Sequence, residues 1–285
     1  MGENAMGEHP PAIDWWITSL CNLSCDFCFG PVPDLHEDLS LRSRIVDALT
    51  ESMAPRVTLT GGEPLVVASL DSFVRRIAHS GKSIVLNTNG ELLTERRADQ
   101  LKLGENVQCV AISIDGGTPA IHRLMRGENA KLDRTIAAAH LAQRRRAMVK
   151  LATVISAVNV DHMQGLVELV AELQPDVWRL LQYSHREQSG VAARHDISDS
   201  RFQEAVALAR ESLPATIAVA PATEAELCGC FTVNGKGQVL VPQIGGYDVL
   251  GSCLDEPIDA LWRRSPNSGT VKRNKRWHLV LDAHH

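Results

Sequence analysis

The chain has 285 residues, 44% of them hydrophobic and 22% charged, and its formal net charge at pH 7 is −5. This composition is that of a globular protein and excludes a collagen, a coiled coil or a wholly disordered chain. The negative charge argues against a nucleic-acid partner, whose binding surfaces are usually strongly basic. No apolar run approaches the about 20 residues of a membrane helix, and the first residues lack a secretory pattern, so we expect a cytoplasmic protein without a membrane anchor.

Short apolar runs alternate with helical patterns from the N-terminus onward. Strands are predicted over residues 13–18, 57–60, 82–87, 107–114, 149–155 and 177–182. The intervening helices are predicted over residues 40–53, 69–79, 94–102, 133–145 and 161–173. Such alternation is typical of a parallel sheet whose right-handed crossovers can close it into a barrel. We therefore expect an α/β fold, with a partial (βα)6 TIM-like barrel over residues 12–183 after a flexible N-terminus at residues 1–11.

The pattern changes after the last of these strands. The predicted elements there are a helix over residues 199–213, strands at 231–233 and 238–241 around an Asn-Gly turn, and a helix over 257–264. We expect residues 184–264 to form a small C-terminal α+β extension that caps the barrel. Residues 265–285 read as a basic, solvated tail.

Three of the seven cysteines lie in one loop, Cys21-Asn22-Leu23-Ser24-Cys25-Asp26-Phe27-Cys28, directly after the first predicted strand. An odd cysteine count without a secretory pattern indicates metal binding rather than a disulfide framework. Thiolates at this C-x3-C-x2-C spacing suit zinc or an iron–sulfur cluster. Zinc would need a fourth ligand, for which His36 is a loosely spaced candidate. A cluster held by three cysteines instead keeps one iron open to a substrate or cofactor.

Polar and glycine-rich segments also follow the next strands. They are Gly61-Gly62-Glu63-Pro64, Asn87-Thr88-Asn89-Gly90 and Ser113-Ile114-Asp115-Gly116. Because the carboxyl ends of parallel barrel strands meet at one rim, these segments and the cysteine loop are expected to converge there.

The cysteine loop, the Gly61-Gly62-Glu63-Pro64 segment and the order of elements resemble the radical S-adenosylmethionine (SAM) superfamily over residues 12–183. The resemblance implies that Cys21, Cys25 and Cys28 ligate a [4Fe-4S] cluster whose fourth iron binds SAM. It also implies a low-potential electron donor, such as flavodoxin or ferredoxin. The electron would cleave SAM and yield a 5′-deoxyadenosyl radical that takes hydrogen from a carbon.

The same resemblance implies a SAM pocket. Its candidate residues are Phe27 near the adenine, Gly61, Gly62 and Glu63 at the SAM amino group, Asn87 and Asn89 on the ribose or methionine side, and Ser113 and Arg126 at the methionine carboxylate. Plain structural roles are the alternative: a strand-end hydroxyl for Ser113, a surface position for Arg126, and turn positions for the two asparagines.

Two groups within the superfamily resemble this chain more closely. The viperin-like nucleoside triphosphate dehydratases are similar at residues 13–18, at Asn159 and at residues 178–182. That group carries Lys-x-Asn on the fifth strand, where this chain has Lys150-Leu151-Ala152, which weakens the case for a nucleotide. Lys150, Arg179 and Gln182 are the candidate substrate residues, and the two cations either meet phosphate or lie at solvated strand ends.

The second group comprises small natural-product enzymes of the neomycin-epimerase type, with a shortened, twitch-like C-terminal region. In those epimerases a cysteine thiol returns hydrogen to the substrate, and Cys253 is the candidate here. An auxiliary cluster on Cys228, Cys230 and Cys253 is disfavoured, because Gln243 stands where a ligand cysteine often sits.

These resemblances lead to one expectation and three alternatives. We expect hydrogen abstraction from a small, aminosugar-like polar substrate, with epimerisation ahead of dehydrogenation. A nucleoside triphosphate dehydratase is the main alternative. A redox sensor or a structural zinc protein would leave Glu63 and Arg126 without a role.

Overall fold

The computed structural model describes residues 9–28, 38–183, 192–223, 230–243, 246–266 and 268. Within these ranges the strands form one sheet in the order β10-β9-β8-β1-β2-β3-β4-β5-β6-β7. The strands are β1 (Ile13–Thr18), β2 (Arg56–Gly61), β3 (Ser83–Thr88), β4 (Cys109–Ser113), β5 (Met148–Ile155), β6 (Val177–Gln182), β7 (Ala218–Ala222), β8 (Thr232–Val233), β9 (Gln238–Gln243) and β10 (Gly246–Ser252). Neighbours from β1 through β7 pair in parallel, as do β8 and β1, whereas β9 pairs antiparallel with both β8 and β10.

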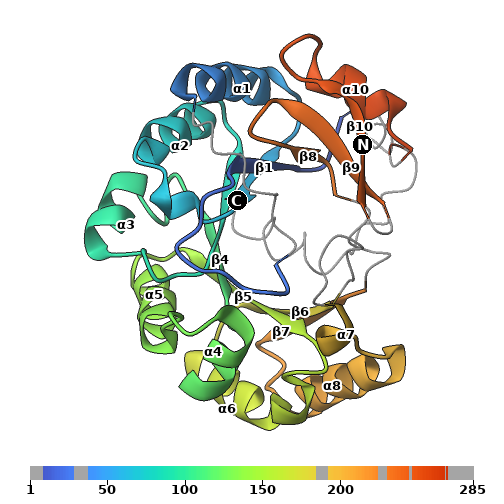
Figure 1. Cartoon of the computed structure of the whole chain (residues 1–285). Coiled ribbons are helices and arrows are strands. Elements are labelled where there is room, and N and C mark those ends of the chain that lie inside the picture. The colour runs from blue at the N-terminus through green and yellow to red at the C-terminus, as the bar shows by residue number, and fades with distance from the viewer. Residues whose placement is uncertain are drawn as a thin grey trace.

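Helices cover the outside of this curved sheet, as Figure 1 shows. They are α1 (Leu39–Glu51), α2 (Leu70–His79), α3 (Glu95–Leu101), α4 (Pro119–Arg126), α5 (Leu132–Arg144), α6 (Met163–Leu173), α7 (Ala192–His195), α8 (Asp199–Ser212) and α10 (Ile258–Arg264), with short 3-10 turns at Pro64–Val66 and Val160–His162. None of the helices in the described part of the chain is long and apolar enough to span a bilayer.

The alternation of side chains along β1 defines the two faces of the sheet. Ile13, Trp15 and Ile17 are fully buried in the main apolar core, and the Trp15 ring lies 5.8 Å from that of Phe73 on α2. These residues therefore face the helices, and Asp14, Trp16 and Thr18 face the barrel interior, because successive strand side chains point to opposite faces. Each fully buried apolar side chain of this kind stabilises the fold by about 1.5–3 kcal/mol.

The predicted α/β partial barrel is confirmed, and the structure adds helices α4 and α7 and strands β7 and β10 to the predicted elements. Helix α4 begins with Pro119 after the capping Thr118 and ends at Arg126, where Gly127 caps it with φ +95°. Strand β7 contains a proline and β10 two glycines, both of which weaken strand propensity, so the sequence pattern did not reveal them. The strands after residue 183 extend both edges of the barrel sheet rather than forming a sheet of their own.

Candidate active site

The three loop cysteines directly follow β1 at the carboxyl edge of the sheet. Cys21 and Cys28 are exposed, and Cys25 is half-buried with its thiol 3.5 Å from the backbone oxygen of Arg126. Burial raises the pKa of Cys25 to about 12, and the Arg126 guanidinium opposes this shift by favouring the thiolate. Three soft ligands in one accessible loop fit an iron–sulfur cluster with one open iron.

The Gly61-Gly62-Glu63 turn packs against the start of the cysteine loop. The Gly62 amide donates to the Thr18 oxygen at 2.7 Å, and the Glu63 amide donates to the Leu20 oxygen at 2.8 Å. A Cβ atom on Gly62 would lie 2.1 Å from that Leu20 oxygen, and Gly61 has φ +122°. Glycine is therefore required at both positions, because the turn approaches the backbone that presents Cys21.

The Glu63 carboxylate is 1% exposed and joins the ends of β2 and β3. Its oxygens accept hydrogen bonds from the Leu65 amide at 3.0 Å, the Thr88 hydroxyl at 2.8 Å and the Asn89 amide at 2.8 Å. Burial raises the pKa of Glu63, and these three donors lower it. The carboxylate thus stabilises the rim itself, and its predicted contact with the SAM amino group stays a prediction.

The two predicted asparagines lie beside this carboxylate. Asn89 donates from its side chain to Asn22 at 2.8 Å and lies 3.9 Å from the Cys21 sulfur. The side-chain oxygen of Asn87 is buried and has no hydrogen-bond partner among the described residues. Asn87 is thus the member of the pair with an acceptor available to a cofactor, and Ser113 lies at the end of the adjacent strand β4.

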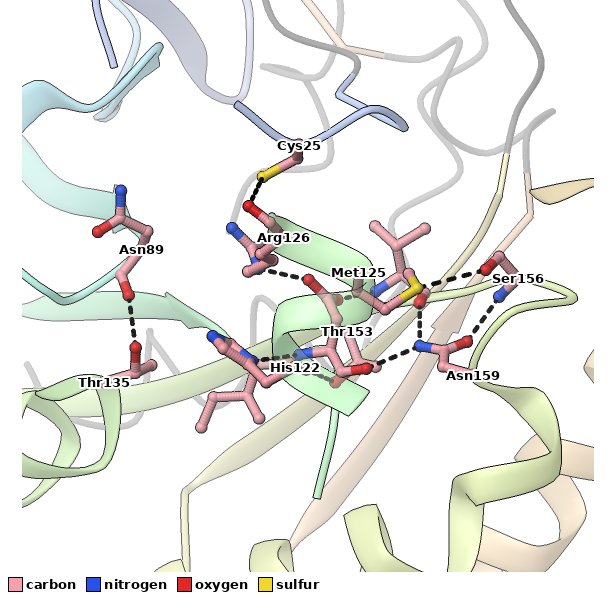
Figure 2. A network of polar contacts seen from close by, with 12 residues as sticks. Cys25, Asn89, His122, Met125, Arg126, Thr135, Thr153, Ser156 and Asn159 are labelled. Atoms are coloured by element: carbon pink, nitrogen blue, oxygen red, sulfur yellow. Dashed lines mark hydrogen bonds and ion pairs between the residues drawn. The ribbon is translucent and has the colours of Figure 1, made fainter. Parts of the chain in front are cut away.

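Arg126 lies on α4, next to Cys25, and forms a buried ion pair (Figure 2). Its Nε donates to a carboxylate oxygen of Asp115 at 2.5 Å, and its guanidinium carbon lies 5.9 Å from the centre of the Phe27 ring. The other Asp115 oxygen accepts from the Val154 amide at 2.7 Å. Burial raises the pKa of Asp115, and Arg126 opposes this shift. Arg126 is thus not a surface residue, and its predicted contact with the methionine carboxylate stays a prediction.

Helix α7 contacts the cysteine loop through His195, which the sequence analysis did not identify. The His195 ring is fully buried and contacts a carboxylate oxygen of Asp26 at 2.9 Å and the Ser156 hydroxyl at 3.2 Å. It also lies 5.6 Å from the Phe27 ring. Arg194 holds the other Asp26 oxygen at 3.1 Å. Because His195 and Asp26 are 169 residues apart, no local spacing indicated this contact.

The predicted substrate residues separate into two environments. Lys150 and Arg179 lie on the inner face of β5 and β6. Gln182 instead donates to Asp199 at the start of α8, at 2.7 Å, so it is not brought together with the two cations. Asn159 is fully buried, and its side chain bonds the backbone oxygens of Asp115 and Val154 (Figure 2), which gives it a structural role in a turn.

The structure does not bring Cys253 to the cysteine loop. Its thiol belongs to the main apolar core together with residues of α10, and its exposed fraction is 6%. Asp255 and Arg44 are the charged residues that affect its pKa, which burial raises to about 11. Cys230 instead lies on the barrel side, hydrogen-bonded to Asp14. Cys228, His36 and the side chain of Gln243 lie outside the described residues, so the auxiliary cluster is not tested.

A family model described as the radical SAM superfamily matches residues 17–170, more than half of the chain. The chain belongs to this superfamily. Members of the radical SAM superfamily use a [4Fe-4S] cluster and SAM, so these are the cofactors of the protein. The three cysteines and the adjoining rim supply a donor set that fits them.

Similar proteins carry out different radical SAM reactions. An AdoMet-dependent heme synthase of Methanosarcina barkeri is 30% identical over 175 residues, which are 59% of this chain and 49% of the relative. A GTP 3′,8-cyclase of Xanthomonas axonopodis is 31% identical over 53% of this chain and 49% of the relative. The chain thus spans about half the length of these curated relatives.

Two solved structures share the fold. Streptococcus suis SuiB, bound to its precursor peptide SuiA, has a TM-score of 0.71 at 16% identity, covering 93% of this chain and 67% of that one. The enzyme anSMEcpe with bound AdoMet has a TM-score of 0.69 at 17% identity, covering 91% and 82%. At this identity the likeness shows the fold alone.

His195→Ala is expected to leave iron binding intact and to raise the KM for SAM. The substitution keeps all three cysteines but removes the polar contacts with Asp26 and Ser156 and the ring contact with Phe27. Loss of an outer partner of a metal site typically costs about 10- to 100-fold in affinity or activity. The measurements are the KM for SAM and the electron paramagnetic resonance spectrum of the reduced protein with SAM. His195→Gln, whose amide nitrogen can still reach Asp26, should restore most of the loss, and exposed His140→Ala should change neither measurement. A wild-type spectrum and KM in His195→Ala would contradict this positioning role.

Proposed function

We propose that the protein cleaves SAM reductively and abstracts a hydrogen atom from a carbon of a small polar substrate held in the barrel. The observation that carries this proposal is the packing of the C-x3-C-x2-C loop against the Gly61-Gly62-Glu63 turn, at the edge where the parallel strands end. When bound, the cluster and SAM supply a 5′-deoxyadenosyl radical that can attack an unactivated carbon. The chain itself must place that carbon and exclude competing hydrogens.

The proposed roles of the residues follow from their positions. Cys21, Cys25 and Cys28 would hold the cluster. The Gly61-Gly62-Glu63 turn, Asn87, Asn89, Ser113 and Arg126 line the same rim and would hold SAM, with Phe27 at the adenine. Thiol ligands require a reducing compartment, which agrees with a cytoplasmic enzyme and a low-potential donor such as flavodoxin or ferredoxin.

The reaction itself belongs to the proposal. Epimerisation needs a hydrogen donor on the face of the substrate carbon opposite to the radical. Cys253 is buried among apolar side chains, so the expectation that it is this donor has no support. The relatives named above are a heme synthase and a GTP cyclase, and neither carries the name of an epimerase. Dehydrogenation therefore precedes epimerisation in our proposal. A dehydratase remains the second candidate, because two cations on neighbouring strands suit a phosphate.

Anaerobic reconstitution tests the proposal. The protein is loaded with iron and sulfide, reduced with a low-potential reductant and given SAM, and 5′-deoxyadenosine is measured by chromatography. A loaded protein that forms no 5′-deoxyadenosine would contradict the proposal and favour the sensor alternative. Candidate aminosugars and nucleotides are then assayed in heavy water by product mass. A dehydrogenase removes two hydrogens, a dehydratase removes water, and an epimerase incorporates one solvent deuterium without other change in mass.

Cys253→Ala is expected to retain iron, SAM cleavage and product formation. The thiol packs among apolar side chains, so its removal should lower the free energy of unfolding by about 1 kcal/mol. Iron analysis, 5′-deoxyadenosine yield and product mass check this expectation. Loss of an inverted product with SAM cleavage intact would instead restore Cys253 as the hydrogen donor, and loss of iron would identify it as a ligand.

A further inference from the structure

Four polar side chains gather on the inner face of the barrel. Asp14 of β1 is hydrogen-bonded to Thr58 and Cys230 and interacts electrostatically with Lys150 of β5 and Arg179 of β6. Lys150 is 7% exposed, whereas Asp14 and Arg179 are half-buried. None of these groups belongs to the SAM rim described above, so their convergence needs a separate explanation.

The strand register fixes this convergence. Arg179 pairs with Ala152, which is two residues beyond Lys150, so the two cations are diagonal neighbours on one face of the sheet. Asp14 pairs with Thr232, which is two residues beyond Cys230, so the thiol and the carboxylate also share a face. The inward-facing positions of β1, β5 and β6, with Cys230 before β8, thus bring one carboxylate, one thiol and two cations together.

Two cations and one carboxylate face one another in this group, which suits an anionic ligand. Burial, and then repulsion by Arg179, lower the pKa of Lys150 to about 7, against the attraction of Cys109, Asp14 and Cys230. The inner face elsewhere carries a small apolar cluster of Val85, Cys109, Ala111 and Met148. Packing alone would be satisfied by more apolar residues, because burying charged side chains carries a large desolvation cost. Charged groups buried together in this way are typical of functional sites.

We propose that Asp14, Lys150, Arg179 and Cys230 form the substrate-anchoring site, and that this site takes an anionic group, a carboxylate or a phosphate. The inference rests on the proposed function and adds the substrate class to it. The guanidinium of Arg179 can grip such an oxyanion with two nitrogens, and Lys150 adds a point charge. Asp14 attracts the two cations, and its negative charge keeps the anionic group of the substrate away from the position that Asp14 itself occupies. A cationic aminosugar would be repelled by the same pair.

Binding of small probe anions tests the site. Inorganic pyrophosphate and succinate are titrated separately by calorimetry into the reconstituted protein with SAM, which distinguishes phosphate from carboxylate. Saturable binding of either is expected. Lys150→Met and Arg179→Met should each weaken it by about 10- to 150-fold, the range for loss of one charge-assisted hydrogen bond. Arg75→Met, which removes an exposed cation on α2, is the matched control and should leave binding unchanged.

Asp14→Asn provides the sharper arm, because its expected effect has the opposite sign. The amide can still accept a hydrogen bond from Thr58 but no longer competes with the anion for Lys150 and Arg179. Binding should therefore tighten, whereas simple damage to the site would weaken it. If wild-type protein binds neither probe, if the two cation variants bind as wild type, or if Asp14→Asn binds more weakly, the inference is overturned.

The pH dependence supplies an independent arm. Lys150 is faced by Arg179 of β6, Cys109 of β4, Asp14 of β1 and Cys230. Because only protonated Lys150 attracts an anion, affinity should fall as pH rises through about 7. Lys150→Arg keeps a positive charge at this position and should bind the anion without a fall in affinity near pH 7. This variant also keeps the test valid if Lys150→Met does not fold. The same fall in affinity retained in Lys150→Arg would overturn the assignment to Lys150.

The two proposals can fail separately in the same samples. Formation of 5′-deoxyadenosine reports the proposed function, and calorimetric anion binding reports the site. Protein that binds pyrophosphate in the expected pattern but does not cleave SAM refutes the former alone. Protein that cleaves SAM but binds neither anion refutes the latter alone.

Discussion

Replacement of any one of Cys21, Cys25 and Cys28 by alanine is expected to abolish SAM cleavage. Each substitution removes one of only three proposed protein ligands from a cluster with one iron left open. Loss of an outer-shell partner costs about 10- to 100-fold, and loss of a ligand itself should exceed that range. The measurements are iron per protein and 5′-deoxyadenosine formed under anaerobic reduction.

Cys109→Ala is the matched control for iron content. Cys109 is a fully buried cysteine on β4, away from the loop, so iron binding should be as in the wild type. A loop variant that keeps full 5′-deoxyadenosine formation would refute the assignment of that cysteine. Serine variants add a second check, because a hydroxyl keeps the volume of the thiol but is a poor ligand for iron.

The sequence predicted the barrel well because its signals are local. The apolar runs of β1 through β6 and the helical periods between them are contained within short windows, so their order and the parallel pairing followed. The same holds for the rim. The spacing of Cys21 with the other loop cysteines indicated metal binding, and the superfamily resemblance implied the roles of Gly62 and Glu63. The structure packs their segments against one another.

The missed features depend on contacts between distant residues. His195 follows β6 and contacts Asp26, which follows β1, and nothing in the local pattern of either residue indicates this. Asp14 is flanked by tryptophan and isoleucine in a strand, so its inward direction became evident only from the burial of Trp15 on the opposite face. Arg126 was assigned to a cofactor, but its buried partner Asp115 lies in the loop between β4 and α4.

Arg126→Leu is expected to lower the free energy of unfolding by about 3–5 kcal/mol, the typical cost of removing one partner of a buried ion pair. Asp115 is fully buried, so its carboxylate would be left without the guanidinium that compensates for its desolvation. Urea unfolding of the metal-free protein, followed by circular dichroism, measures this change. Loss of Arg126 should raise the pKa of Asp115 further, beyond the rise that burial already causes. A raised carboxyl pKa in the folded state means that the deficit should shrink as pH falls and Asp115 becomes protonated.

The double variant Asp115→Asn/Arg126→Leu separates the ion pair from cofactor binding. Removing both charges avoids the uncompensated carboxylate, so much of the stability lost in Arg126→Leu should return. The guanidinium is still absent, so SAM affinity should stay lower by about 10- to 150-fold if Arg126 also holds the methionine carboxylate. Wild-type SAM affinity in the refolded double variant would limit Arg126 to its structural role. Wild-type stability in Arg126→Leu alone would show that the pair with Asp115 does not hold α4 against the end of β4.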